Sequence, residues 1–150
     1  MSEISEIYIT YPEEASQHRM NTKFIDVLSK QIGDPNVKVA TNALKILKIL
    51  VEVIPSLIEN NLSVISNELF NCFASQKQEV KSLAEELFDD LSVGIESWML
   101  IQHMCNGILY GVQKSKPSII EKLNNIVPNV IRTKPNIFQK NVYGMLNKVV

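Results

Sequence analysis

The chain is short of glycine and proline, with five Gly and six Pro in 150 residues. These low counts exclude collagen-like and linker-like structure. Cysteine is also scarce: Cys72 and Cys105 have no further ligand near them at metal-binding spacing, so we expect two buried free thiols. No apolar run reaches the ~18 residues of a membrane span, because charged residues and a proline interrupt the longest stretch, 46–58.

Neither sign of charge is in excess over the whole chain, since the formal net charge is −1. This balance favours neither nucleic-acid binding nor membrane attachment. The amino terminus is acidic where a signal peptide would be basic and then apolar, which favours a cytoplasmic or nuclear protein. The charge is unevenly distributed, however, with −7 over residues 1–113 and +6 over residues 114–150. This asymmetry suggests directional electrostatics toward a charged protein partner.

Few side chains are suited to catalysis, so we expect that the protein is not an enzyme and that it binds no cofactor and no metal. The two histidines, His18 and His103, have no nearby acid or nucleophile in any known motif. Gly107 and Gly111, four apart in a helical pattern, indicate close helix packing rather than a phosphate loop. An acidic helix face is expected to be solvated rather than a cation site; its residues are Glu85, Glu86, Asp89 and Asp90.

Helical periodicity dominates the rest of the chain. Apart from a β-like run at 7–11, apolar residues recur three and four apart, which predicts α-helices. The predicted helices span 13–31, 36–54, 60–74, 79–94, 96–112, 118–132 and 136–149. Pro128 is expected to kink the sixth of these helices or to end it early.

The helices repeat with a period near forty residues. A shift of 41 residues places Ala43 on Ala84 and Leu47 on Phe88, and a further 39 places Ala84 on Leu123. A period near forty made of paired helices is typical of HEAT and armadillo repeats, whose units stack because no unit buries its apolar surface alone.

We therefore predict an all-α fold, an α-solenoid of HEAT/armadillo-like antiparallel helix pairs with about three and a half repeats. Residues 1–12 form an N-terminal extension and residues 13–150 a single domain, with repeats at about 13–54, 60–94 and 96–132 and a half repeat at 136–149. We also expect this chain to be part of a longer array or of a larger assembly. The residues expected to be buried between layers are Val39, Ala43, Leu47, Val80, Ala84, Phe88, Ile119, Leu123 and Val127.

The turns inside the repeats carry lysine. In a stacked array these turns share one edge, where functional variation collects, so Lys38, Lys77, Lys114 and Lys116 are expected to line it. Two interpretations stay open: a basic ridge that faces an acidic partner, and lysines that are simply common in solvated turns.

The turn sequences resemble those of TOG domains, the tubulin-binding HEAT arrays of microtubule polymerases, CLASP proteins and crescerins. The resemblance is carried by Gly33-Asp34-Pro35-Asn36-Val37-Lys38-Val39-Ala40, by Ser75-Gln76-Lys77 with Val80-Lys81, and by Trp98 through Lys114-Ser115-Lys116.

This resemblance implies a tubulin or microtubule partner, a place in the cytoplasm at the microtubule cytoskeleton or cilium, and a role in microtubule dynamics. The binding residues that it implies are Asp34, Asn36, Lys38, Gln76, Lys77, Lys114 and Lys116. The alternative function is a HEAT or armadillo scaffold that binds an unrelated protein.

Overall fold

A computed structural model describes residues 20–149 of the chain, and all regular structure in that range is helical. The all-α prediction is confirmed. The predicted extension 1–12, the β-like run 7–11 and residues 13–19 of the first predicted helix lie outside the described residues.

Seven helices lead to the C-terminal segment. They are α3 (Met20–Ile32), α4 (Val37–Val53), α5 (Pro55–Asn60), α6 (Leu62–Cys72), α7 (Gln78–Gly94), α8 (Ser97–Tyr110) and α9 (Lys116–Thr133). A 3₁₀ turn, η1 (Gln113–Ser115), precedes α9. The C-terminal segment is one helical run in three parts: α10 (Pro135–Phe138), the π-helical turn η2 (Gln139–Tyr143) and α11 (Gly144–Val149).

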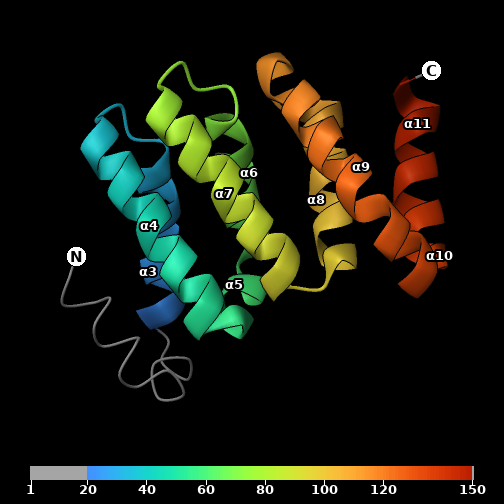
Figure 1. Cartoon of the computed structure of the whole chain (residues 1–150), viewed down its shortest axis with the longest axis horizontal. Helices are drawn as coiled ribbons and strands as arrows, with labels where there is room; N and C mark the ends of the chain where they lie inside the picture. Colours follow the sequence, from blue (N-terminus) through green and yellow to red (C-terminus); the bar gives the residue numbers. More distant parts are fainter. Residues whose placement is uncertain (1–19, 150) are drawn as a thin grey trace.

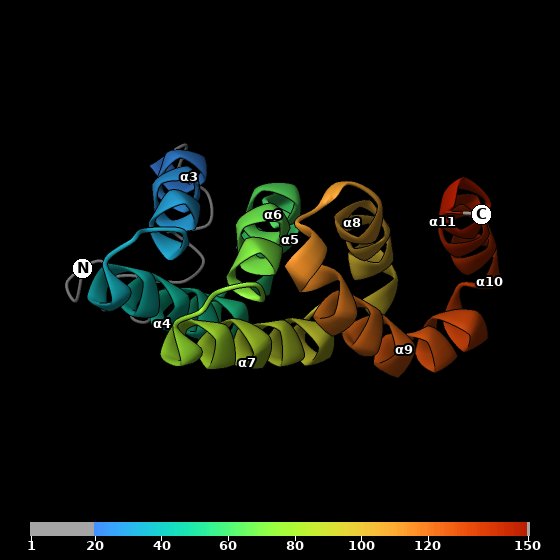
Figure 2. The same ribbon diagram turned by 90° about the horizontal axis from the view of Figure 1, so that it is seen from above.

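The sequence prediction and the structure differ mainly at prolines. The helix α5 begins at Pro55, in a stretch that the periodicity left unassigned, and it buries Leu57 and Ile58. Proline fits the first position of a helix because its missing N–H has no partner there in any case. Within α9, Pro128 does not end the helix, which continues to Thr133 and bends over its last turns (Figure 2). Of the two outcomes expected for Pro128, the structure has the bend.

The helices form two layers of stacked pairs. One layer holds α3, α6, α8 and α11, and the other holds α4, α7 and α9 (Figure 2). Helices pack within the pairs α3–α4, α6–α7 and α8–α9, and neighbouring pairs pack through α3–α6, α6–α8 and α4–α7. This is the stacked α-solenoid that the forty-residue register predicts.

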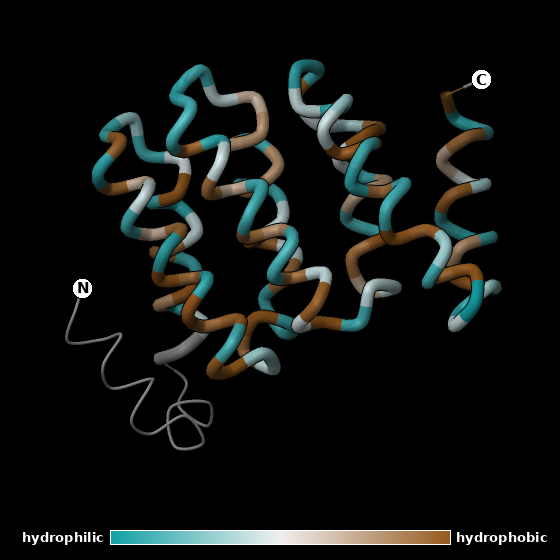
Figure 3. Tube along the Cα trace, in the orientation of Figure 1, coloured by the Kyte–Doolittle hydropathy of each residue, from teal (hydrophilic) through white to brown (hydrophobic). Residues whose placement is uncertain are grey.

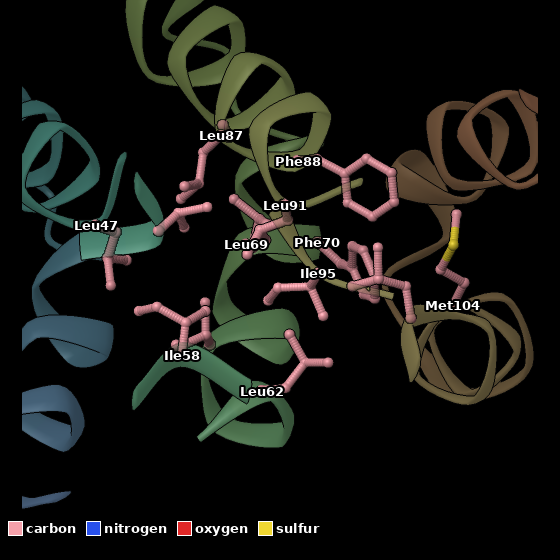
Figure 4. Packing of buried hydrophobic residues seen from close by; sticks show 14 of the residues in the cluster. Leu47, Ile58, Leu62, Leu69, Phe70, Leu87, Phe88, Leu91, Ile95 and Met104 are labelled. Atoms are coloured by element: carbon pink, nitrogen blue, oxygen red, sulfur yellow. The ribbon is translucent and has the colours of Figure 1, made fainter. Parts of the chain in front are cut away.

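The core is continuous between the layers. Of the nine residues expected to be buried, seven are buried, whereas Val39 and Val127 are half-buried. At the centre, the ring of Phe70 lies 5.7 Å from that of Phe73 and 6.2 Å from that of Phe88, measured between centroids. Leucines and isoleucines from α4, α5, α6 and α7 extend the core from Phe70 and Phe88 toward α4 (Figure 4).

The second layer is packed unevenly. Helices α4 and α7 pack along their lengths, and Ala43 and Ala84, both fully buried, are small enough to permit that approach. The equivalent position in α9 is Leu123, and α9 runs at an angle to α7 (Figure 2). A hollow of about 310 Å³ lies between α7 and α9.

Candidate functional site

The first turn of the candidate edge joins α3 to α4, and its polar side chains shape the backbone. Oδ1 of Asp34 accepts a hydrogen bond from the backbone N–H of Asn36 at 2.7 Å. Oδ1 of Asn36 in turn accepts one from the N–H of Lys38 at 3.0 Å and so caps the start of α4. Two of the predicted binding residues therefore also stabilise the turn, while the Lys38 side chain is exposed.

The second turn joins α6 to α7 and is tied to the first. Oγ of Ser75 accepts a hydrogen bond from the N–H of Lys77 at 3.2 Å. The Nζ of Lys77 donates to the backbone carbonyl of Pro35 across the repeat boundary. Gln76, which lies between Ser75 and Lys77 in the sequence, is exposed. This contact brings the predicted residues of the first two turns into one surface.

A hollow of about 370 Å³ separates these two turns and is mixed in charge. Asp34, Glu68 and Lys77 line it together with the buried Cys72, whose Sγ donates to the carbonyl of Ile32 at 3.3 Å. Burial, with a smaller contribution from Glu68, raises the pKa of the Cys72 thiol to about 11. The thiol is therefore protonated at neutral pH and acts as a core residue.

The third turn joins α8 to α9 through η1. A Cβ on Gly111 would lie 2.3 Å from the carbonyl oxygen of Gly107, so this tight exit from α8 requires glycine. The buried Ser115 fixes the other side of the turn, since its Oγ donates to the carbonyl of Val112 at 2.8 Å. Lys114 is exposed.

All three turns lie at the same edge of the solenoid (Figure 1). The edge is predominantly hydrophilic along its length (Figure 3). Lys38, Lys77 and Lys114 are exposed there, and Lys116, the first residue of α9, is half-buried. Three of the four lysines on this edge are therefore presented to solvent.

The acidic face of α7 contacts lysines of the two neighbouring helices. Glu86 and Asp90 both lie near the Nζ of Lys48 on α4, at 2.8 Å and 3.4 Å. Asp89 lies 2.6 Å from the Nζ of Lys122 on α9. The hydrogen bond to Glu86 and the charge of Asp90 raise the pKa of Lys48, against the opposing effect of burial.

The face is solvent-accessible as expected, with Glu86 57% and Asp89 62% exposed, and lysines from both neighbouring helices of its layer also pair with it. A signal for this was present in the sequence. The 41-residue register that aligns apolar positions also aligns Lys48 with Asp89, which places opposite charges side by side on adjacent helices.

Other candidate groups are structural. Gly107 permits close packing, since a Cβ there would lie 2.9 Å from the ring of Phe70. Cys105 is a buried free thiol whose pKa burial raises to about 11. Burial lowers the pKa of His103.

Within residues 20–149, no three His, Cys, Asp or Glu side chains are grouped as a metal site. Along the same range, no helix combines the length and the apolar character needed to cross a membrane.

Comparison with known proteins gives one informative match. No protein-family model matches the chain. Over 129 residues, or 83% of this chain, the sequence is 28% identical to TOG array regulator of axonemal microtubules protein 1 of Mus musculus. The chain spans 7% of that relative's length. This similarity supports a TOG-related helical domain.

Proposed function

We propose that this chain is a TOG-like module that binds tubulin or microtubules through the basic edge formed by its three intra-repeat turns. The observation that carries the proposal is the alignment of Lys38, Lys77, Lys114 and Lys116 along one edge of the solenoid. The similarity to a relative named as a regulator of axonemal microtubules supports it. The same name supports a place at the microtubule cytoskeleton, including the axoneme, and a protein partner.

Electrostatics give the proposal a physical basis. Tubulin is strongly acidic, so a row of exposed lysines would speed encounter and orient docking. The shape of the edge is stabilised by its own polar groups, because the Asp34, Asn36 and Ser75 side chains each accept a backbone hydrogen bond within a turn. A preformed edge loses little conformational entropy on binding.

The test is charge reversal at the edge. Each exposed ion pair contributes only about 0–1 kcal/mol, so no single lysine should decide binding. We expect the triple variant Lys38→Glu, Lys77→Glu and Lys116→Glu to weaken tubulin binding by roughly tenfold or more, mostly through slower association. Raising the salt concentration should reproduce the loss. Surface-immobilised tubulin at low salt gives both rate constants.

Controls need equal charge change away from the edge. Lys48 is unsuitable although it lies outside the turns, because it pairs with Glu86 and Asp90. The matched control is Lys23→Glu, Lys45→Glu and Lys140→Glu, all at exposed positions on other parts of the solenoid. Because Lys77 also bonds the first turn, the pair Lys38→Glu with Lys114→Glu tests the edge without disturbing that contact.

Two outcomes contradict the proposal: no tubulin binding by the wild-type chain at low salt, or equal binding by the triple variant and the wild type. Either result would favour the alternative function, a HEAT or armadillo scaffold for a different protein partner. Thermal unfolding of each variant, followed by circular dichroism, separates loss of binding from loss of fold.

A further inference from the structure

A second surface lies at the C-terminal end of the described chain, beyond the first two turns of the basic edge. A hollow of about 480 Å³ opens between the end of α8, the start of α9 and the last turn of α11. This volume is within the ~300–1,000 Å³ typical of ligand pockets. The residues of interest in its lining are Leu109, Lys116, Pro117, Ile120, Lys148 and Val149.

The wall of the hollow is apolar and accessible. Ile120 is 44% exposed and Val149 is 63% exposed, which is unusual for two large aliphatic side chains at one site. Pro117 and the half-buried Leu109 extend the apolar surface. Apolar side chains combined with a few polar groups are the usual lining of a ligand pocket.

The rim is positively charged. Lys116 and Lys148 line the hollow. Among residues 20–149, no carboxylate lines it and neither lysine forms an ion pair. The Nζ of Lys148 lies 3.4 Å from the Oη of Tyr110 and 6.0 Å from the centroid of its ring, which holds the lysine beside α8.

The backbone at the start of α9 adds positive charge to the same hollow. The 18-residue helix α9 begins at Lys116, with no acidic residue in its first turn and no side-chain cap. Its N-terminal end therefore adds a partial positive charge beside the two lysines. An apolar wall with a positive rim is complementary to a segment that carries negative charges around an apolar side chain.

We propose that this hollow binds an acidic linear peptide of a protein partner, with one large apolar side chain seated against Ile120 and Val149. Carboxylates on either side of that side chain pair with Lys116 and Lys148. The inference goes beyond the proposed function, because it does not require that the partner be tubulin.

The experiment uses the whole chain and a fluorescein-labelled peptide of glutamate and glycine with one central phenylalanine. Binding is measured by fluorescence anisotropy at low salt. We expect the double variant Lys116→Glu and Lys148→Glu to bind the peptide about tenfold more weakly, since two favourable charge pairs become repulsive. The matched control, Lys45→Glu and Lys140→Glu, changes net charge equally and should shift the dissociation constant by less than about twofold.

The apolar contribution is tested separately. Replacing the phenylalanine of the peptide by glycine should weaken binding about fivefold or more, because a buried aromatic side chain contributes at least about 1 kcal/mol. Ile120→Gln should weaken binding of the phenylalanine peptide but not of the glycine peptide. Val93→Gln, at a residue 90% exposed on α7, is its control and should leave both unchanged.

Several results would overturn the inference. They are no peptide binding at low salt, equal binding by the Lys116 and Lys148 double variant, and equal affinity for the phenylalanine and glycine peptides. Phosphatidylserine vesicles that displace the bound peptide and bind more tightly than it does would also overturn it, in favour of a membrane surface. A chain that binds the peptide but not tubulin would contradict the proposed function and leave this inference intact.

Discussion

The close approach of three helices at Gly107 gives a stability prediction whose sign is informative. Gly107 of α8 faces both α6 and α9, and a Cβ at this position would lie 2.9 Å from Cδ2 of Phe70 and 3.1 Å from Cδ1 of Ile119. Both neighbours are buried, at 4% and 0% exposure. The Phe70 ring has little room to move, because the rings of Phe73 and Phe88 pack against it.

Two opposing terms decide the effect of Gly107→Ala. Alanine in place of glycine inside a helix gains about 0.8–1 kcal/mol from helix propensity. An extra methyl group forced into a packed core costs about 1–3 kcal/mol. The contact distances are shorter than ordinary van der Waals separation, so the packing cost should win and the net loss should reach up to about 2 kcal/mol.

Gly144→Ala is the matched control, since it is the same substitution at a helical position where a Cβ would meet no atom within 4 Å. It should stabilise the chain by about 0.5–1 kcal/mol. Thermal unfolding followed by circular dichroism resolves the two, because 1 kcal/mol corresponds to about 2–4 °C in Tm for a chain of this size. A Gly107→Ala variant that melts as high as Gly144→Ala would refute the packing argument.

Other predictions follow from burial. Leu47→Ala should cost about 2–5 kcal/mol by leaving a cavity, and Ala84→Leu about 1–3 kcal/mol by overpacking the α4–α7 crossing; unchanged urea midpoints would contradict both. Burial lowers the pKa of His103 in the folded chain. Near and just below the ordinary histidine pKa, the unfolded chain therefore binds more protons than the folded chain, so the free energy of unfolding falls as the pH falls through this range. His103→Gln should flatten that slope, and an equal slope in urea titrations would contradict the assignment. Cys72 and Cys105, with thiol pKa values raised to about 11, should react slowly with a thiol reagent at neutral pH until denaturant is added; fast labelling of the native chain would exclude this.

Much of the fold was predictable because each repeat obeys the same packing requirement. The apolar period fixes the helices, and a register that aligns Ala43 with Ala84 already implies a close α4–α7 crossing. The short helix α5 could not be found by periodicity, because it is too short for a helical pattern to be distinguished. The bend after Pro128 depends on tertiary packing that keeps α9 helical beyond the proline.

The candidate edge was predictable to the level of turns, since turns between stacked helices share an edge. The register places Asn36, Lys77 and Lys116 at equivalent positions, but it does not predict the bond between Lys77 and Pro35. That contact depends on the separation of two turns, which the sequence does not specify. The hollow beside Lys148 depends in the same way on how α11 returns toward α8.

The angle between α7 and α9 has a mechanical consequence. In a linear array of units coupled to their neighbours, the cooperative unit ends where the coupling is weakest. In the second layer, the α7–α9 boundary has a hollow and the Lys122–Asp89 ion pair where α4–α7 has continuous packing. The second layer is therefore the more compliant side of this joint, whereas the close approach of Gly107 on α8 to Phe70 on α6 holds the first layer together. A partner that contacted both the second and the third turn would fix the angle at this joint.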